Sequence, residues 1–227
     1  PTGIPTSRFA RGDGPAFRAR QGIPPGQPVA LFVGRVAHEK NIGFLLEAMT
    51  HTRRQCPDAL LLVAGEGPAR ASLQAGVGRQ GLADAVRFIG YLDRRDALPD
   101  CYAAADVFAF ASRTETQGLV LLEAMAAGLP VVALSEMGTR DILDAGRGSI
   151  TPPAIPQVFG ETLAHVLNHS SAWQHLGDDA AQYAREWSDV AMAGRMATLY
   201  RQVADLKIAP DRALTAPRSK SPRGATA

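Results

Sequence analysis

The stretch VFAFASRTETQGLVLLEAMAAGLPVVAL, residues 107–134, contains an apolar segment, a helical segment and a second apolar segment. Residues 107–110 and 130–134 are apolar throughout, which is typical of strands buried on both faces of a sheet. The segment between them, 118–127, has the composition of a helix and opens at Gly118. Strand, helix and strand at this spacing predict a right-handed crossover, and therefore a parallel sheet.

The same alternation extends toward both ends of the chain. Further strands are expected at 29–34, 59–65 and 86–90, with a short one near Ser149. Helices are expected at 42–55, 68–80, 94–105, 139–145, 155–168 and 192–204, with Pro68 in the first turn of the second. We therefore predict an α/β, Rossmann-like fold with helices on both faces of a parallel sheet. Ligands bind such sheets beyond the carboxyl ends of the strands, so the loops after Gly34, Gly65, Gly90 and Phe110 should line one crevice.

The length and composition indicate one globular domain with flanking segments. The chain has 227 residues, 46% of them hydrophobic, which is ample for a buried core. We assign 1–27 to an interdomain connection and lead-in, 28–206 to the Rossmann-like domain and 207–227 to a disordered basic tail. The chain begins without Met, so we expect processing or excision. No stretch reaches the roughly 20 apolar residues of a membrane-spanning helix, and no leader resembles a signal peptide.

The charge distribution indicates which partners to expect, and the cysteines indicate the redox environment. Residues 207–227 carry five cations and one anion, a net +4 against +2 for the whole chain, so residues 1–206 sum to about −2. The basic character lies in the tail, and nucleic acid is not expected as a partner. Cys56 and Cys101 are isolated in sequence, which favours free thiols in a reducing cytoplasm.

Two cations follow the first strand, in the loop Gly34-Arg35-Val36-Ala37-His38-Glu39-Lys40-Asn41. Arg35 and Lys40 precede a helix whose N-terminus is already positive from its dipole. Cations there are unfavourable unless an anion lies between them, and a diphosphate suits the planar fork of Arg and the point charge of Lys. Gly34 lets a ligand approach the backbone, and Glu39 is a further candidate contact. The alternative is a pair of solvated surface cations.

Two carboxylates flank the start of the helix at 118–127. The free N–H groups at Gly118, together with the helix dipole, form a seat for an anion. Glu123 lies among apolar helix residues, where a buried carboxylate needs a partner, and a ribose diol can donate two hydroxyls to it. Glu115 precedes the helix, where a sugar attached to the diphosphate would lie. The alternatives are a helix-dipole role for Glu115 and a solvent-face salt bridge for Glu123.

Two weaker patterns point elsewhere. Gly65-Glu66-Gly67 after a strand is typical of dinucleotide-binding folds, but the third glycine of that motif would fall at Arg70. Arg is too bulky for the helix–strand contact required there, so we reject a nicotinamide or flavin site. His165 and His169 have the spacing of a metal pair on a helix, but no third ligand is near in sequence, which favours ordinary surface histidines.

Five segments resemble the GT-B glycosyltransferases of family 4, in that family's order. They are PTGIPTSRF at 1–9, VGRVAHEKN at 33–41, VAGEGPAR at 63–70, VRFIGYL at 86–92 and YAAADVFAFASRTETQGLVLLEAMAAGLPVVA at 102–133. The resemblance covers about residues 1–205, and its most specific part is the family's E-x7-E pair, Glu115 and Glu123. It implies a retaining, metal-independent enzyme of two Rossmann-like domains, of which this chain is the C-terminal, donor-binding one.

The resemblance also implies roles for individual residues. Arg35 and Lys40 are similar to the cationic pair that stabilises the leaving diphosphate, Glu115 to the donor-sugar carboxylate, and Glu123 to the ribose ligand. The turn Gly90-Tyr91-Leu92 resembles the segment whose backbone reads the nucleobase. Further substrate contacts are expected at Gln117, Gly118, Leu119 and Val120.

The implied partners are a nucleoside-diphosphate sugar and the enzyme's own N-terminal acceptor-binding domain, without a metal or other cofactor. The version SRTETQGL is similar to that of some lipid-directed members, which indicates a lipid-linked or polysaccharide acceptor. We expect a cytoplasmic protein that associates peripherally with the inner face of the membrane. The segment Met137-Gly138-Thr139-Arg140-Asp141 departs from the family's Gly-Gly pattern. The alternatives are another nucleotide-sugar enzyme of this fold, an epimerase or hydrolase, and a non-catalytic nucleotide-binding module.

Overall fold

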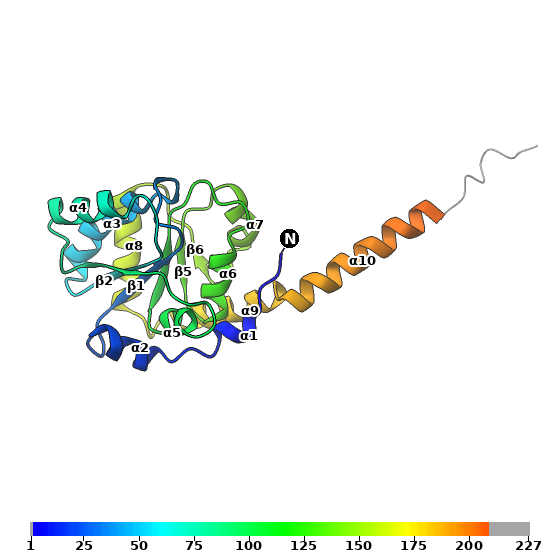
Figure 1. Cartoon of the computed structure of the whole chain (residues 1–227), viewed down its shortest axis with the longest axis horizontal. Helices are drawn as coiled ribbons and strands as arrows, with labels where there is room; N and C mark the ends of the chain where they lie inside the picture. Colours follow the sequence, from blue (N-terminus) through cyan, green and yellow to red (C-terminus); the bar gives the residue numbers. More distant parts are fainter. Residues whose placement is uncertain (1, 209–227) are drawn as a thin grey trace, which may run out of the picture. The chain divides into compact units, whose positions relative to one another are not determined.

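The computed structural model describes residues 2–208 and centres on a parallel sheet of six strands (Figure 1). The strands are β1 Val29–Val33, β2 Leu60–Ala64, β3 Val86–Gly90, β4 Val107–Phe110, β5 Val131–Ala133 and β6 Ser149–Ile150. Every residue of β1, β2, β4 and β5 is buried, as continuous apolar strands covered on both faces should be. The predicted Rossmann-like α/β fold is confirmed.

The strand order is β3-β2-β1-β4-β5-β6. Successive strands are added on one side of β1 up to β3 and on the other side from β4 to β6, so the switch point of the sheet lies between β1 and β4. Ala30 in β1 is in register with Leu61 of β2 on one side and with Val107 of β4 on the other. The chain therefore leaves the carboxyl ends of β1 and β4 in opposite directions across the sheet. The loops that follow these two strands diverge and leave a crevice, which is where doubly wound sheets bind their ligands.

Helices cover both faces of the sheet, and short 3-10 turns lie at His38–Lys40 and Met137–Thr139. The helices are α1 Thr6–Phe9, α2 Gly14–Gln21, α3 Ile42–Gln55, α4 Arg70–Arg79, α5 Ala97–Ala103, α6 Leu119–Ala126, α7 Arg140–Leu143, α8 Pro156–Asn168, α9 Gln174–Glu186 and α10 Asp189–Ile208. α3 packs against α8, which contacts β1, β4 and β5. α6 contacts β4 and β5, and right-handed crossovers place it on the face opposite α3.

Several helix boundaries differ from the sequence prediction. α5 begins at Ala97 rather than at 94, because the Asp93 carboxylate accepts the backbone N–H groups of Arg95 and Asp96 and holds this segment as a turn. α4 begins at Arg70, so Pro68 precedes the helix instead of lying in its first turn.

Three helices were not predicted: α1, α2 and α9. α9 buries only small residues and one tyrosine, a face too weakly apolar to stand out as a periodic pattern. α2 packs on α5, and α1 packs on α5 and α6, so both short helices lie against the sheet's own helices.

Of the described residues, 2–192 form one compact unit, and 193–208, the rest of α10, belong to a second. Lys207 and Ile208 of the predicted basic tail belong to α10, while 209–227 lie outside the described residues. Over residues 2–208, no helix is both long and apolar enough to cross a membrane. Cys56 and Cys101 are both buried free thiols.

Candidate functional site

Backbone hydrogen bonds connect the loops after β1 and β2 to the ends of the neighbouring strands. Gly34 N–H donates to Ala64 at 3.0 Å, and Gly65 N–H donates to Gly90 at 2.8 Å. Gly65 has a φ of +138°, and a Cβ there would lie 1.9 Å from the carbonyl oxygen of Gly34. Only glycine fits this close approach, so the motif rejected as a dinucleotide fingerprint has a structural reason for its glycine.

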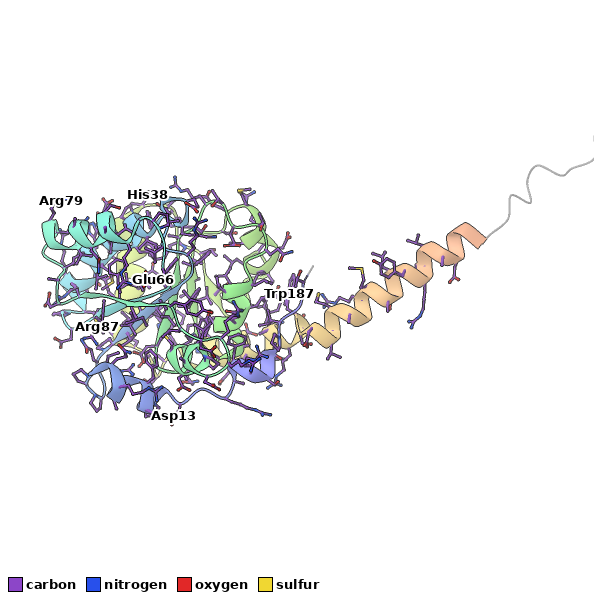
Figure 2. All side chains as sticks on the ribbon, viewed as in Figure 1. Asp13, His38, Glu66, Arg79, Arg87 and Trp187 are labelled. Carbon is purple, nitrogen blue, oxygen red and sulfur yellow. The ribbon has the colours of Figure 1, made fainter. Side chains whose placement is uncertain are left out.

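A cavity of about 330 Å³ lies at the carboxyl ends of these strands. It is lined by Val33, Gly34, Arg35, Ala64, Gly65, Glu66, Tyr91, Leu92, Arg94, Leu98 and Val120. Five of these residues were predicted from the sequence: Gly34, Arg35, Tyr91, Leu92 and Val120. Glu66, labelled in Figure 2, was not predicted, and its carboxylate pairs with Arg70 of α4. The walls are largely apolar with a few charged groups, as expected of a small-molecule site.

The two predicted site loops meet across the switch point. Lys40 Nζ lies 2.7 Å from Oε2 of Glu115, and both side chains are mostly buried, at 19% and 18% exposure. Two further contacts tie the same loops: Asn41 Nδ2 donates to the carbonyl of Ala111, and Thr114 Oγ1 donates to the carbonyl of Glu39. The carboxyl ends of β1 and β4 therefore carry a joined cation and carboxylate.

Glu115 is held as an anion at the start of α6. Burial by itself would raise the pKa of this carboxyl, but the hydrogen bond and charge of Lys40 and the backbone N–H groups of Gly118 and Gln117 lower it below the ordinary value. Gly118 is the N-cap residue of α6 with a φ of +66° and provides no side-chain cap. The positive helix end and Lys40 thus converge on one negative charge, which is the electrostatic environment that a phosphate requires.

Glu123 is buried inside α6 with 1% exposure, and the solvent-face alternative for it is wrong. Tyr102 Oη donates to its Oε2 at 3.0 Å, and the Arg94 guanidinium pairs with its Oε1. Burial raises the pKa of Glu123, while the charge of Arg94 and the hydrogen bonds from Tyr102 and Arg94 oppose that rise. Burial and the neighbouring Glu123 charge raise the pKa of Tyr102 well above its ordinary value, so Tyr102 remains a donor.

The segment that departs from the family's glycine pattern packs against the Glu115 loop. Gly138 N–H donates to the carbonyl of Glu115 at 3.0 Å, and a Cβ at Gly138 would lie 2.1 Å from the carbonyl oxygen of Thr116. Met137 has a φ of +51° and is 59% exposed. Thr139 and Glu136 form a reciprocal capping box that fixes the turn.

The remaining predicted residues lie around this arrangement, and their side chains take no part in the contacts described above. Gln117, Gly118 and Leu119 form the start of α6, and Glu39 is exposed on the loop after β1. The sequence reasoning missed Arg94 and Tyr102. Tyr102 belongs to the YAAAD segment and could have been noted as a donor for a buried carboxylate, but no sequence signal distinguishes Arg94 from its neighbour Arg95.

The histidine pair lies apart from these loops, at the carboxyl end of α8. The ring centroids of His165 and His169 are 4.7 Å apart, and Nδ1 of His169 is 2.9 Å from the carbonyl oxygen of His165. Across the described part of the chain, no group of three or more His, Cys, Asp or Glu side chains could hold a metal ion.

A larger cavity of about 510 Å³ lies at the amino ends of β1 and β4, between α2 and the turn that leads into β4. Its charged residues, Arg18 and Asp106, pair with each other at 2.9 Å, and Asp106 also accepts the backbone N–H of Val29 at the start of β1. Arg18 donates in addition to the carbonyls of Ala104 and Gln27. Arg18 and Asp106 therefore use their charged groups in bonds within the protein. This cavity lacks the cations and carboxylates that surround the cavity at the carboxyl ends of the strands.

Doubly wound α/β proteins bind their ligands at the switch point of the sheet, where this structure has cations and carboxylates. A profile of the family described as "Glycosyl transferases group 1" matches residues 13–187. The chain belongs to this family, and its fold is that of the GT-B enzymes.

Individual proteins of this family are similar to the chain over most of its length. The chain is 29% identical over 189 residues to alpha-D-kanosaminyltransferase of Streptomyces kanamyceticus, covering 82% of this chain and 48% of that protein. It is 32% identical over 216 residues to D-inositol 3-phosphate glycosyltransferase 2 of Catenulispora acidiphila, covering 90% and 50%. The structure of sucrose-phosphate synthase from Thermosynechococcus elongatus aligns with a TM-score of 0.78 and 28% identity, over 91% of this chain and 52% of that one. The chain thus spans about half the length of the relatives it matches.

Proposed function

We propose that this chain is the donor-binding half of a glycosyltransferase that moves a sugar from a nucleoside diphosphate to an acceptor. The observation that carries the proposal is the joining of Lys40 and Glu115 across the β1–β4 switch point. This pair combines a cation, a carboxylate and a helix N-terminus, which are the groups needed for a diphosphate and for sugar hydroxyls.

The neighbouring cavity is the proposed site of the nucleoside. Tyr91 and Leu92 lie at the carboxyl end of β3 and line it, in the position proposed for reading the base. Val33, Leu98 and Val120 supply apolar surface for the flat rings. Glu123, adjacent through its pair with Arg94, is the proposed acceptor of ribose hydroxyls.

In the proposed mechanism, Arg35, Lys40 and the first N–H groups of α6 stabilise the negative charge that develops on the diphosphate as the bond to the sugar breaks. Lys40 exchanges its contact with Glu115 for one with phosphate. Glu115 is then free to accept sugar hydroxyls. We propose transfer with retention at the front face of the sugar, as the family resemblance implies. We also propose that no metal is needed, because two cationic side chains and the positive N-terminus of α6 supply the positive charge for the leaving diphosphate. The resemblance in SRTETQGL supports a lipid-linked or polysaccharide acceptor held by a second domain, and a cytoplasmic enzyme at the membrane face.

Calorimetric titration of the protein with UDP, GDP and ADP in EDTA tests the proposal. We expect one nucleotide to bind without metal, and Lys40→Met to weaken it by about tenfold or more, since a charge-assisted contact to phosphate is lost. Arg79→Met is the matched control, because Arg79 is exposed on α4 and does not line the cavity. Figure 2 shows Arg79 apart from Glu66, which does line it. Binding that is equal in Lys40→Met and wild type would exclude the proposed diphosphate site.

Turnover separates a transferase from a binding module of the same fold. In an enzyme that contains this chain and its acceptor domain, Lys40→Ala should lower kcat by about 100-fold, because the charge on the leaving diphosphate loses its main counterion. A near-normal kcat in that variant would remove Lys40 from the catalytic groups. Release of free sugar rather than a glycosylated acceptor would favour the hydrolase alternative.

A further inference from the structure

The carboxylate of Glu123 is satisfied on both oxygens by side chains of this protein. Oε2 accepts from Tyr102, and Oε1 pairs with Arg94, inside a helix whose neighbouring side chains are apolar. An ionised carboxylate at 1% exposure needs such donors, because leaving one oxygen without a partner costs the full desolvation of that group.

The two partners differ in how firmly they are held. Tyr102 is fully buried, and its ring packs edge-on against Phe9 and beside Phe108, at centroid distances of 5.7 and 5.9 Å. Arg94 lies on the turn before α5, and its side chain is 57% exposed. Tyr102 is therefore a fixed donor, whereas Arg94 can leave Glu123 and be solvated at once by water.

Arg94 also connects the buried carboxylate to the cavity. Arg94 lines the cavity together with Arg35, Tyr91 and Val120, whereas Glu123 is not among the lining residues. A hydroxyl that approaches Oε1 from the cavity therefore meets the guanidinium that already occupies this oxygen.

We propose that Arg94 is a specificity-determining residue that covers Oε1 of Glu123 and that the ribose hydroxyls of a bound nucleotide must displace it. This inference rests on the proposed function, since it concerns the same nucleotide site. Only a ligand with hydroxyls to donate can replace the interaction that Arg94 gives up. A nucleotide without them leaves Arg94 in place and gains nothing from Glu123.

The proposal predicts how the loss of Arg94 changes the affinities of two kinds of nucleotide. Removal of the Arg94 side chain ends the competition and leaves Oε1 without its donor until a ribose hydroxyl arrives. Ribonucleotide affinity should rise, while the affinity of a nucleotide without the ribose diol should stay the same or fall. The ratio of the affinity for the ribonucleotide to the affinity for the nucleotide without the diol therefore increases. A purely structural role of Arg94 would not change this ratio.

The experiment compares wild type, Arg94→Ala and Arg95→Ala by calorimetry at pH 8, with UDP and 2′,3′-dideoxy-UDP, or with the matching guanine or adenine pair if that base binds. Arg95→Ala is the matched control, because Arg95 adjoins Arg94, does not line the cavity and has no ion pair within residues 2–208. Thermal unfolding of each variant establishes that it is folded. Arg94→Lys, which keeps a charge but loses the planar fork, should fall between wild type and Arg94→Ala, and replaces Arg94→Ala should that variant not fold.

We expect Arg94→Ala to bind the ribonucleotide about three- to tenfold more tightly than wild type, with no gain for the dideoxy ligand, and Arg95→Ala to match wild type. Weaker binding of both ligands to Arg94→Ala would overturn the inference and assign Arg94 to direct attraction of the phosphates. Unchanged binding of both would overturn it as well. If wild type binds none of UDP, GDP and ADP, the proposed function itself fails, and that result is distinct from either of the others.

Discussion

Lys40 and Glu115 are 75 positions apart in the chain, yet Nζ of one lies 2.7 Å from Oε2 of the other. The contact joins the loop after β1 to the loop after β4. These two neighbouring strands flank the switch point, where the order of strands along the sheet reverses. Because each group has a mostly buried side chain, the pair both fixes the two loops and holds the charges in the crevice.

The Lys40–Glu115 pair should stabilise the fold in a pH-dependent way. The folded-state pKa of Glu115 is lowered from 4.5, so the stabilisation is complete above that pH and is lost as the pH falls through the folded value. We expect Lys40→Met to reduce the free energy of unfolding by about 1 kcal/mol at pH 7. Urea denaturation of wild type and Lys40→Met from pH 7 to pH 3 measures this, and a difference that does not shrink toward the acid end would contradict the pairing.

Tyr102→Phe should destabilise the protein through Glu123. The variant loses a buried hydrogen bond to a carboxylate, which costs about 1–3 kcal/mol at pH 7. Because burial raises the pKa of Glu123 and Tyr102 opposes that rise, the loss is largest where Glu123 is ionised and falls as the pH is lowered and Glu123 becomes protonated.

Thermal or urea unfolding at pH 8 and pH 5 gives the comparison for Tyr102→Phe. Tyr200→Phe is the control, since Tyr200 is 67% exposed on α10 and should change the free energy of unfolding by no more than a few tenths of a kcal/mol. Equal effects of the two variants would show that the Tyr102 hydroxyl is not bonded to Glu123.

Gly65→Ala should disrupt the contact between the loops after β1 and β2. The added Cβ would lie 1.9 Å from the Gly34 carbonyl oxygen at a φ that disfavours alanine, so we expect a loss on the order of 2–3 kcal/mol. Gly43→Ala makes the same chemical change within α3, where nothing lies within 4 Å of the new Cβ. It should be neutral or stabilising by up to about 1 kcal/mol. A tolerated Gly65→Ala would mean that the two loops are not in contact.

Neither cysteine should react with a thiol reagent while the protein is folded. Cys56 and Cys101 are buried, and burial raises the pKa of Cys101 to about 12, so almost no thiolate is present at pH 8. Dithionitrobenzoate should label neither thiol in native protein and both in guanidinium chloride. Fast labelling of Cys101 in the native protein would contradict its burial and indicate that α5 opens readily.

The strands and the ligand loops could be predicted from the sequence because their signals are local. β3 and β4 and helix α3 have the predicted bounds, since continuous apolar runs and a helical period are read from neighbouring residues. Gly34, Arg35 and Val120 come together because the carboxyl ends of parallel strands share one edge, which follows from the topology alone.

The partners of the charged groups could not be predicted, because they depend on the conformations of distant loops. The need of Glu123 for a partner was evident, but Arg94 is 29 positions away, on a turn that the sequence predicted to be the start of α5. Likewise, the spacing of Glu115 gave no indication that Lys40 would bond to it directly.

A crystal structure of the protein with a bound nucleoside diphosphate is the decisive experiment for the proposed donor site. We expect the base against Tyr91 and Leu92, the diphosphate between the loop after β1 and the N-terminus of α6, and a ribose hydroxyl within hydrogen-bond distance of Glu123. A nucleotide bound instead in the cavity beside Arg18 and Asp106, at the amino ends of β1 and β4, would rule out the proposed site.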